Sequence, residues 1–380
     1  MQPWARGFNP LGIEKTHDNN QASPLDIPQK TTVSLCACLT KPLEGLAERG
    51  GLHLPSDALS IVHNPMNALR WFLPNLAGLM ILTANGVFAQ APAQVSPVQS
   101  GQGHPFVCTD YTQGKVFIVS KEGRVEWEYD GVTNCNDIWA LPNGNLLFDT
   151  GHGVREVTRD KKVVFDYEST SEIYACQRLA NGNTFVGECN SGRLLELDPA
   201  GKIVKEVRLL PEGSNGGHAY LRNARRLDNG HYLVAHYGLQ VVREYDARGR
   251  LVREIPAAGG PHSAIRLPNG NTLISCADGK GGSRVFEIDP ADRIVWEVRN
   301  GDLPGISLKF MAGLQRLPNG NSVMANWLGH NQFGRAPHLI EVTPDKNVVW
   351  TFSDFKTIRT ISSVQLLDVP GDATRGDILH

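Results

Sequence analysis

One arginine and three histidines fall close together in a repeated pattern, and their side chains could handle negative charge and protons. They are Arg222, His218, His236 and His262. Arginine is a forked, permanently charged donor for planar or tetrahedral anions, whereas histidine donates, accepts or transfers a proton near neutral pH. Polar side chains also occur at such positions because water reaches them, so the argument depends on the clustering of all four over two adjacent repeats. The sequence predicts that they form the rim of a site for a small polar or anionic molecule.

The repeats that position these residues are marked by a turn that occurs five times. Its sequence is Leu-Pro-Asn-Gly-Asn or a close variant, at residues 141–145, 179–183, 227–231, 267–271 and 317–321. The glycines are 38, 48, 40 and 50 residues apart, a period that suits a four-stranded propeller blade. Asn-Gly between apolar runs also predicts a hairpin with a type I′ turn, which needs positive φ at both central residues.

A second repeated element gives the number of blades. Six polar turns, each followed by an apolar strand, begin at Ser120, Thr158, Asp198, Asp246, Asp289 and Thr343. No complete blade follows the strand at 362–368, so we expect it to pair with 106–109 and close the ring, which removes an exposed sheet edge. The predicted fold is all-β: a six-bladed β-propeller with four-stranded antiparallel blades over residues 104–372, followed by a tail at 373–380. Bulky residues that recur at one blade position are expected to pack between blades, namely Trp127, Trp296 and Trp350.

Aligning the repeats on their turns places more polar residues at one end of the channel. The beginnings of the inner strands supply Asn136, Asp137, Tyr174, Arg222, Asn223 and His262. The ends of the strands that follow supply Glu188, His236, Cys276 and Asn326. Loops at this end add His218, Trp327 and His330, of which Trp327 could stack on a ligand ring. Because all of them lie opposite the Asn-Gly turns, we predict that they form a ligand-binding set at the channel mouth.

Charge and ligand spacing narrow the classes of partner. The chain has 37 basic and 39 acidic residues, and this net charge of -2 leaves no basic excess for nucleic-acid phosphates. Three histidines of the rim, with Glu188 one blade away, could converge on a zinc ion. No short-spaced ligand pair supports such a site, so we expect no metal and retain zinc as the alternative.

The segment at 66–89 has the layout of a secretory signal peptide. A short basic start at 66–70 precedes a mostly apolar stretch at 71–84, and Val87-Phe88-Ala89 offers small residues to signal peptidase. The apolar core is too short for a comfortable membrane span, so we expect a secreted or periplasmic protein with no membrane span in the mature chain. Residues 1–65 are expected to be an extension from a start codon assigned too early, with a genuine disordered extension as the alternative. Residues 90–103 are expected to be a flexible linker.

The cysteines fit an oxidising compartment without fixing a disulfide pattern. Five of the seven lie in the predicted propeller, at Cys108, Cys135, Cys176, Cys189 and Cys276. Five thiols cannot all pair internally. Cys176 and Cys189 flank one hairpin and could form a bridge.

From about residue 106 to 368, the repeats resemble those of bacterial secreted PQQ-binding-like β-propeller repeat proteins. The stretch 302–306 leading into 314–321 and the Gly-Lys/Arg-x-Val-x-Trp tails account for the resemblance. Quinoprotein dehydrogenases of this type have eight blades, an adjacent cysteine pair and calcium ligands. With six predicted blades and no vicinal cysteines, this chain is not expected to bind PQQ, and its cofactor stays unknown.

The blade number and the Leu-Pro-Asn-Gly-Asn turn are also similar to those of arylsulfotransferase-like propellers. In those enzymes a channel histidine takes the sulfuryl group, which implies His236 or His262 as the nucleophile here and Arg222 as the residue that stabilises the anion's charge. The His-Asp-Ile often found before the first such turn in related propellers is Asn136-Asp137-Ile138 in this chain. Three functions therefore remain open: an exported ligand-binding propeller, a sulfuryl-transfer enzyme, and a scaffold for another exported protein.

Overall fold

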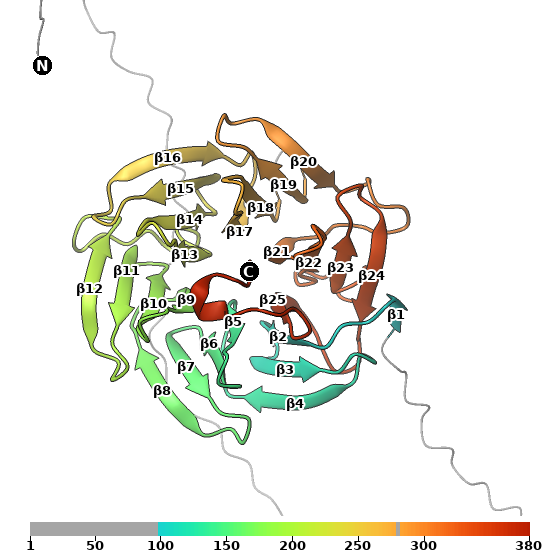
Figure 1. Cartoon of the computed structure of the whole chain (residues 1–380), viewed down its shortest axis with the longest axis horizontal. Helices are drawn as coiled ribbons and strands as arrows, with labels where there is room; N and C mark the ends of the chain where they lie inside the picture. Colours follow the sequence, from blue (N-terminus) through green and yellow to red (C-terminus); the bar gives the residue numbers. More distant parts are fainter. Residues whose placement is uncertain (1–97, 279–281) are drawn as a thin grey trace, which may run out of the picture. The chain divides into compact units, whose positions relative to one another are not determined.

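Six β-sheets surround a central channel in the computed structural model, which describes residues 98–278 and 282–380 (Figure 1). All neighbouring strands are antiparallel, with four strands in five of the sheets and five in the sixth. This arrangement confirms the predicted all-β, six-bladed propeller. The predicted extension at 1–65, the signal peptide at 66–89 and the first part of the linker lie outside the described residues.

The blades are numbered from the one that contains both ends of the ring, and their strands are given from the inside outward. Blade 1 consists of β25 (Ile361–Leu366), β2 (Phe106–Asp110), β3 (Lys115–Val119) and β4 (Val125–Asp130). Blade 2 consists of β5 (Ile138–Ala140), β6 (Leu146–Asp149), β7 (Gly153–Val157) and β8 (Val163–Glu168). Blade 3 consists of β9 (Ile173–Arg178), β10 (Thr184–Glu188), β11 (Arg193–Leu197) and β12 (Ile203–Arg208).

The second half of the ring repeats this order. Blade 4 consists of β13 (Ala224–Arg226), β14 (Tyr232–His236), β15 (Val241–Tyr245) and β16 (Leu251–Pro256). Blade 5 consists of β17 (Pro261–Arg266), β18 (Thr272–Cys276), β19 (Arg284–Ile288) and β20 (Ile294–Arg299). Blade 6 consists of β21 (Met311–Arg316), β22 (Ser322–Asn326), β23 (Leu339–Val342), β24 (Val348–Ser353) and β1 (Val98–Gly101).

Strands from the two ends of the chain close the ring, as the sequence predicts. In blade 1, β25 pairs with β2 so that Leu366 lies opposite Phe106 and Ser363 lies opposite Thr109. A second closure was not foreseen. Residues 98–101, predicted as part of a flexible linker, form β1 and pair with β24, because the outer edge of blade 6 offers free backbone groups to a strand.

The repeated Asn-Gly turns adopt a different geometry from the type I′ turn that the sequence suggested. In the first copy, Gly144 N donates to Leu141 O and Leu141 N donates to Asn145 O, and Gly144 has φ of 83°. Asn143 is not among the residues with positive φ. The prediction of type I′ is wrong, because the loop has three residues and forms a type I turn followed by a left-handed glycine. The copies with Ala180 and Asp228 in place of proline form the same hydrogen bonds.

Apolar packing between neighbouring blades forms the core. The second strand of each blade from blade 3 to blade 6 is buried at every residue, since both of its faces meet other sheets. The recurring tryptophans lie between blades, as predicted: Trp127 Nε1 donates to Arg159 O in blade 2, and Trp296 Nε1 donates to Pro344 O in blade 6.

Ion pairs repeat at the blade interfaces as well. A glutamate on the third strand of one blade accepts from an arginine at the end of the next blade's inner strand, in the pairs Glu156–Arg178 (2.6 Å), Glu244–Arg266 (2.7 Å) and Glu287–Arg316 (2.8 Å). At the interface where the ring closes, a histidine takes this place. His104 Nε2 lies 3.0 Å from Glu341 Oε2, and His104 Nδ1 lies 2.8 Å from Asp368 Oδ2.

The tail folds back into the end of the channel that carries the Asn-Gly turns, and the last residue lies at the centre of the ring in Figure 1. It begins with the short helix η1 (Ala373–Arg375). Arg316 N donates to Leu379 O (2.9 Å), and Arg225 Nε donates to His380 O (2.9 Å). Between His380 and the open end, the channel encloses a cavity of only about 10 Å³, which is room for roughly one water molecule. The tail therefore closes this end.

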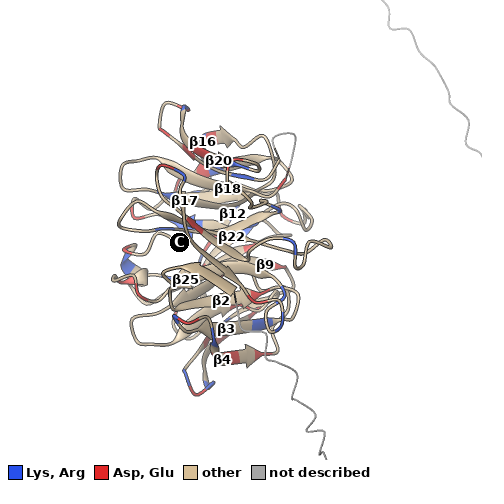
Figure 2. Cartoon of the chain, turned by 90° about the vertical axis from the view of Figure 1, so that its right-hand side faces the viewer, with Lys and Arg blue, Asp and Glu red and all other residues tan. Residues whose placement is uncertain are grey.

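The five propeller cysteines are buried free thiols. The bridge considered between Cys176 and Cys189 is not formed, because Cys176 packs into the core whereas the Cys189 thiol donates to His218 O. In the side view of Figure 2, positions with basic residues and positions with acidic residues are interspersed over the blades. Within residues 98–278 and 282–380, no helix has the length and apolar character needed to cross a membrane.

Candidate functional site

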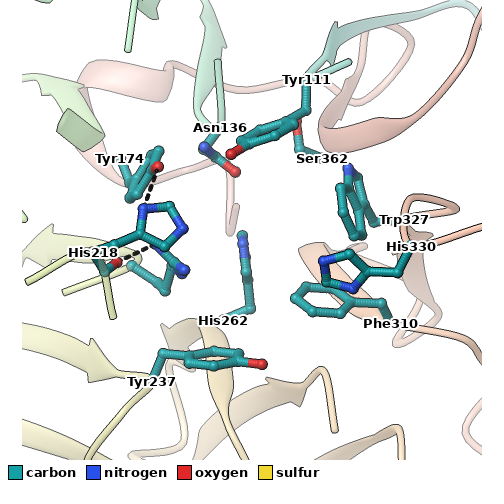
Figure 3. Close-up of a pocket in the computed structure, with 11 residues that line it drawn as sticks. Tyr111, Asn136, Tyr174, His218, Tyr237, His262, Phe310, Trp327, His330 and Ser362 are labelled. Carbon is teal, nitrogen blue, oxygen red and sulfur yellow. Dashed lines mark hydrogen bonds between the residues drawn. The ribbon is translucent and has the colours of Figure 1, made fainter. Parts of the chain in front are cut away.

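A cavity of about 230 Å³ lies at the open end of the channel, where the inner strands begin. Its wall is formed by Tyr111, Asn136, Tyr174, His218, Arg222, Tyr237, His262, Phe310, Trp327, His330 and Ser362 (Figure 3). The inner strands and the loops before them supply one part of this set. In three of the six blades, the residue that directly follows the second strand also contributes to the wall. The channel mouth predicted from the sequence is thus a cavity in the structure.

One side of the cavity is aromatic. Trp327 contacts Phe310 (ring centroids 5.0 Å apart), His330 (4.9 Å) and Tyr111 (5.7 Å), and each of these pairs is edge-to-face. Phe310 also stacks on Tyr237, with centroids 6.2 Å apart. Because these rings brace one another, the wall presents fixed π surface to the cavity.

The opposite side carries a positive charge. The guanidinium of Arg222 lies between two rings, with its central carbon 4.9 Å from the centroid of Tyr174 and 5.2 Å from that of Tyr237. Its Nη1 donates to His218 O. Nε and Nη2 make no hydrogen bond to a described residue, and neither is among the fully buried atoms without a partner, so both reach the cavity.

Two histidines on this side differ in their surroundings. His218 Nδ1 lies 2.7 Å from Glu172 Oε2 and 3.2 Å from the Tyr174 hydroxyl, which orients the ring. His262 makes no hydrogen bond to a described residue through its ring. Burial, together with the positive charge of Arg222, lowers the pKa of His262 to about 3, so its imidazole is neutral near pH 7.

The hydroxyl groups of the two tyrosines beside Arg222 also stay protonated. Burial raises the pKa of Tyr174 and of Tyr237, and the hydrogen bond from Tyr237 to Asp278 raises the latter further. Arg222 therefore provides a permanent positive charge beside neutral tyrosines in this part of the described wall.

The structure brings together seven of the residues proposed from the sequence. They are Asn136, Tyr174, His218, Arg222, His262, Trp327 and His330. Figure 3 shows Tyr174 and His218 across the cavity from Trp327 and His330, with His262 between the two sides.

Two residues from the neighbouring inner-strand position lie deeper in the channel and do not line the cavity. Asp137 is fully buried and forms a two-pronged ion pair with Arg225, with oxygen–nitrogen distances of 2.6 and 2.9 Å. Asn223 faces the same guanidinium, 3.0 Å from Nη1 when its amide oxygen is turned toward it. Only the first of the two predicted positions therefore faces the mouth, and the second contributes to the narrow part of the channel around Arg225.

The residues at the ends of the second strands are also absent from the cavity wall. Each is buried and forms hydrogen bonds with residues nearby. Glu188 accepts from Arg193 (2.6 Å), and Asn326 accepts from Lys309 N (2.7 Å). The two ring nitrogens of His236 lie 2.9 Å from Tyr220 O and 2.9 Å from the Tyr245 hydroxyl. The Cys276 thiol donates to Ala257 O. Their polar groups therefore form hydrogen bonds with backbone and side-chain groups of the loops. The expectation that they face the channel is wrong.

Four wall residues were not proposed from the sequence. Ser362 occupies the same inner-strand position as Asn136 and Arg222, so the repeat alignment contained the signal for it. Tyr111 and Tyr237 directly follow the second strands of their blades, as Trp327 does, and this equivalence could have identified them. Phe310 directly precedes β21, at the position that Gly260 and Glu172 occupy in blades 5 and 3, so the repeat gives its place but no aromatic pattern that would single it out.

The histidines do not gather around a point where an ion could bind. Both ring nitrogens of His236 are engaged by Tyr220 and Tyr245, and Glu188 is held by Arg193. Across the part of the chain that the structure describes, no group of three or more His, Cys, Asp or Glu side chains is arranged to hold a metal ion.

Comparison with known proteins gives a fold and no family. No family model matches the chain, and no curated protein matches it. A solved protein of unknown function from Bacteroides caccae is 27% identical, with a TM-score of 0.63 over 69% of this chain and 98% of that one. Streptogramin B lyase (15% identity, 69% of this chain, 89% of that chain, TM-score 0.48) and virginiamycin B lyase from Staphylococcus aureus (15%, 67%, 87%, 0.45) are more distant. The chain is thus a six-bladed β-propeller similar in fold to a protein whose function is not known.

Proposed function

We propose that this protein is an exported propeller that binds a small anionic ligand in the cavity at its channel mouth. The observation that supports this most is Arg222, a cation that is 9% exposed and has no carboxylate partner among the described residues. A buried charge normally requires a partner, because removing it from water costs several kcal/mol. An anion in the cavity supplies that partner.

The other buried arginines of the ring show what pairing looks like in this fold. Arg225 binds Asp137 (2.6 Å), and Arg284 binds Glu297 (2.5 Å). Arg222 instead presents Nε and Nη2 to the cavity, with its orientation fixed by two tyrosine rings. A preorganised donor of this kind binds an anion without a further cost of ordering a long side chain.

Titration calorimetry of the parent and of Arg222→Gln with acetate, benzoate, methyl sulfate and phenyl sulfate tests the proposal. The substitution removes a charge-assisted contact worth about 1.5–3 kcal/mol, so affinity should fall roughly tenfold to a hundredfold. Arg293→Gln, on an exposed outer turn, is the matched control and should bind as the parent does. Binding of no anion by the parent, or equal affinity of Arg222→Gln in a protein with an unchanged circular dichroism spectrum, would contradict anion binding at this site.

A second candidate, sulfuryl transfer, is favoured by one further observation. His262 is neutral near pH 7, lies in the cavity wall near Arg222, and has ring nitrogens that make no hydrogen bond to a described residue. A neutral imidazole nitrogen could attack the sulfur of an aryl sulfate, breaking the sulfur–oxygen bond and releasing the phenolate. A phenol would then take the group from the histidine, as the resemblance to arylsulfotransferase-like propellers implies.

Turnover of an aryl sulfate separates this enzyme from a binding protein. His262→Ala should abolish turnover while donor binding survives. His236 is unsuited to the nucleophile's role because both of its nitrogens are occupied, so His236→Ala should reduce stability rather than remove a chemical step. A parent protein that binds aryl sulfates without turning them over would leave the binding function and exclude the enzyme.

A further inference from the structure

We infer that the ligand of this cavity is a single aromatic ring that carries one oxyanion group, either a carboxylate or a sulfate. The inference rests on the proposed anion-binding function and adds the part of the ligand that Arg222 does not contact. It follows from the division of the wall into a cationic side and an aromatic side, and from the size of the cavity.

The cationic side fits an anion with two oxygens. Since Nη1 of Arg222 is engaged by His218 O, the free edge of the guanidinium consists of Nε and Nη2. These two donors are parallel and match the oxygen pair of a carboxylate, or two oxygens of a sulfate. The neutral His262 and the amide of Asn136 add uncharged hydrogen-bonding groups in the same wall.

The aromatic side fits a ring and offers few hydrogen bonds. The hydroxyl of Tyr237 already donates to Asp278 Oδ2 (2.7 Å), and the indole nitrogen of Trp327 is buried without a partner among the described residues. Trp327 and Phe310 therefore contribute mainly ring faces and edges, which attract another ring in edge-to-face or offset contacts.

Aromatic walls also bind cations, but the charge around this one excludes that class. A cage for a quaternary ammonium group depends on ring faces with no competing positive charge. Here no carboxylate lines the cavity within the described residues, and Arg222 is part of its wall. Of the nearest acids, Glu172 is engaged by His218 and Asp278 by Tyr237.

The volume suits a small ligand. Pockets for drug-sized molecules typically enclose about 300–1,000 Å³, whereas this cavity has about 230 Å³. Beyond His262, toward the tail, the channel encloses only about 10 Å³, so a ligand has no room to extend in that direction. A benzene ring with its anionic group fits the cavity.

Titration of the parent with matched pairs of ligands tests the ring. Benzoate should bind about tenfold to a hundredfold more tightly than acetate, and phenyl sulfate more tightly than methyl sulfate by a similar factor, because two or more ring contacts are gained. Phenol, which lacks the anion, should bind more weakly than benzoate. The ratio of benzoate to phenyl sulfate affinity identifies which oxyanion the site prefers.

Substitutions locate the ring in the cavity. Phe310→Leu should lower the affinity for benzoate about tenfold and leave that for acetate unchanged, and Trp327→Leu is a second variant should the first not fold. Phe355→Leu is the control, since Phe355 is an exposed aromatic residue outside the wall.

The outcomes separate this inference from the proposed function. If benzoate and acetate bind equally and both depend on Arg222, the ring inference is overturned and anion binding stands. If phenol binds as tightly as benzoate, the anion is not part of the ligand, and the inference is overturned too. If no anion binds at all, the proposed function fails, and the inference fails with it.

Discussion

Substitution of Asp137 tests how the channel is built. The result shows whether this residue binds a ligand or stabilises the contacts between blades. Its two carboxylate oxygens lie 2.6 and 2.9 Å from Arg225, and one of them also accepts from Cys176 N (2.9 Å). Asp137 belongs to the loop before β5, Cys176 to β9 and Arg225 to β13, so one carboxylate connects three consecutive blades. Arg225 in turn holds His380 of the tail.

The substitution Asp137→Ala leaves a guanidinium buried without its partner. Breaking a buried pair in this way typically costs about 3–5 kcal/mol, far more than the pair itself is worth. For a domain of this size about 2 °C is lost for each kcal/mol, so the melting temperature should fall by roughly 6–10 °C. The double variant Asp137→Leu/Arg225→Met should recover part of this loss, because it removes the unpaired charge.

Urea unfolding followed by circular dichroism measures the effect, and an exposed pair of the same geometry provides the control. Arg155 and Asp166 also form a two-pronged pair, at 3.1 and 2.9 Å, but the Asp166 side chain is 39% exposed. Asp166→Ala should therefore cost about 0–1 kcal/mol. A loss below about 1 kcal/mol for Asp137→Ala, or a double variant less stable than the single one, would refute this interpretation. If Asp137→Ala loses ligand binding while its stability is unchanged, Asp137 is part of the binding site.

Two further predictions concern ring closure and export. Hydrogen bonds to Glu341 and Asp368 raise the pKa of His104 above 6.5, so the stabilisation by its charged form is fully present below about pH 6.5 and is lost as the pH rises through the raised pKa. The difference in unfolding free energy between the parent and His104→Gln should therefore shrink from pH 6 to pH 9. A difference that stays constant would contradict stabilisation by the protonated imidazole. We also expect the mature protein to begin near Gln90, and mass spectrometry of the exported product that found residues 1–65 attached would disprove this start.

Most of the fold could be predicted because it is encoded in repeated local signals. Glycine at the end of each Leu-x-Asn-Gly turn has a left-handed conformation that other residues resist, so the turn marks the inner hairpins of blades 2 to 6. The turn type could not be obtained from Asn-Gly alone, since the same dipeptide also ends a three-residue loop in which only the glycine has positive φ. β1 was missed because its pairing depends on a free edge in blade 6, which the residues 98–101 do not reveal by themselves.

The candidate site was only half predictable, and the reason is the direction of side chains. Arg222 and His262 point into the cavity, whereas His236 and Glu188, from an equally polar position, point into loops that they hold in place. A polar residue that satisfies buried backbone groups has the same composition as one that faces a ligand. Tyr237 was not proposed, although it directly follows the second strand of its blade as Trp327 does.

The closed base of the channel limits how any chemistry in this protein could proceed. Among the described residues the tail fills the end near Arg225, so two substrates cannot approach His262 from opposite faces of the disc. A group transfer through a covalent intermediate on His262 would follow ping-pong kinetics, in which the first product leaves through the open end before the acceptor enters. For a binding protein the same geometry means that every molecule bound must return to the side from which it came, so the propeller could capture and release its ligand but could not conduct it.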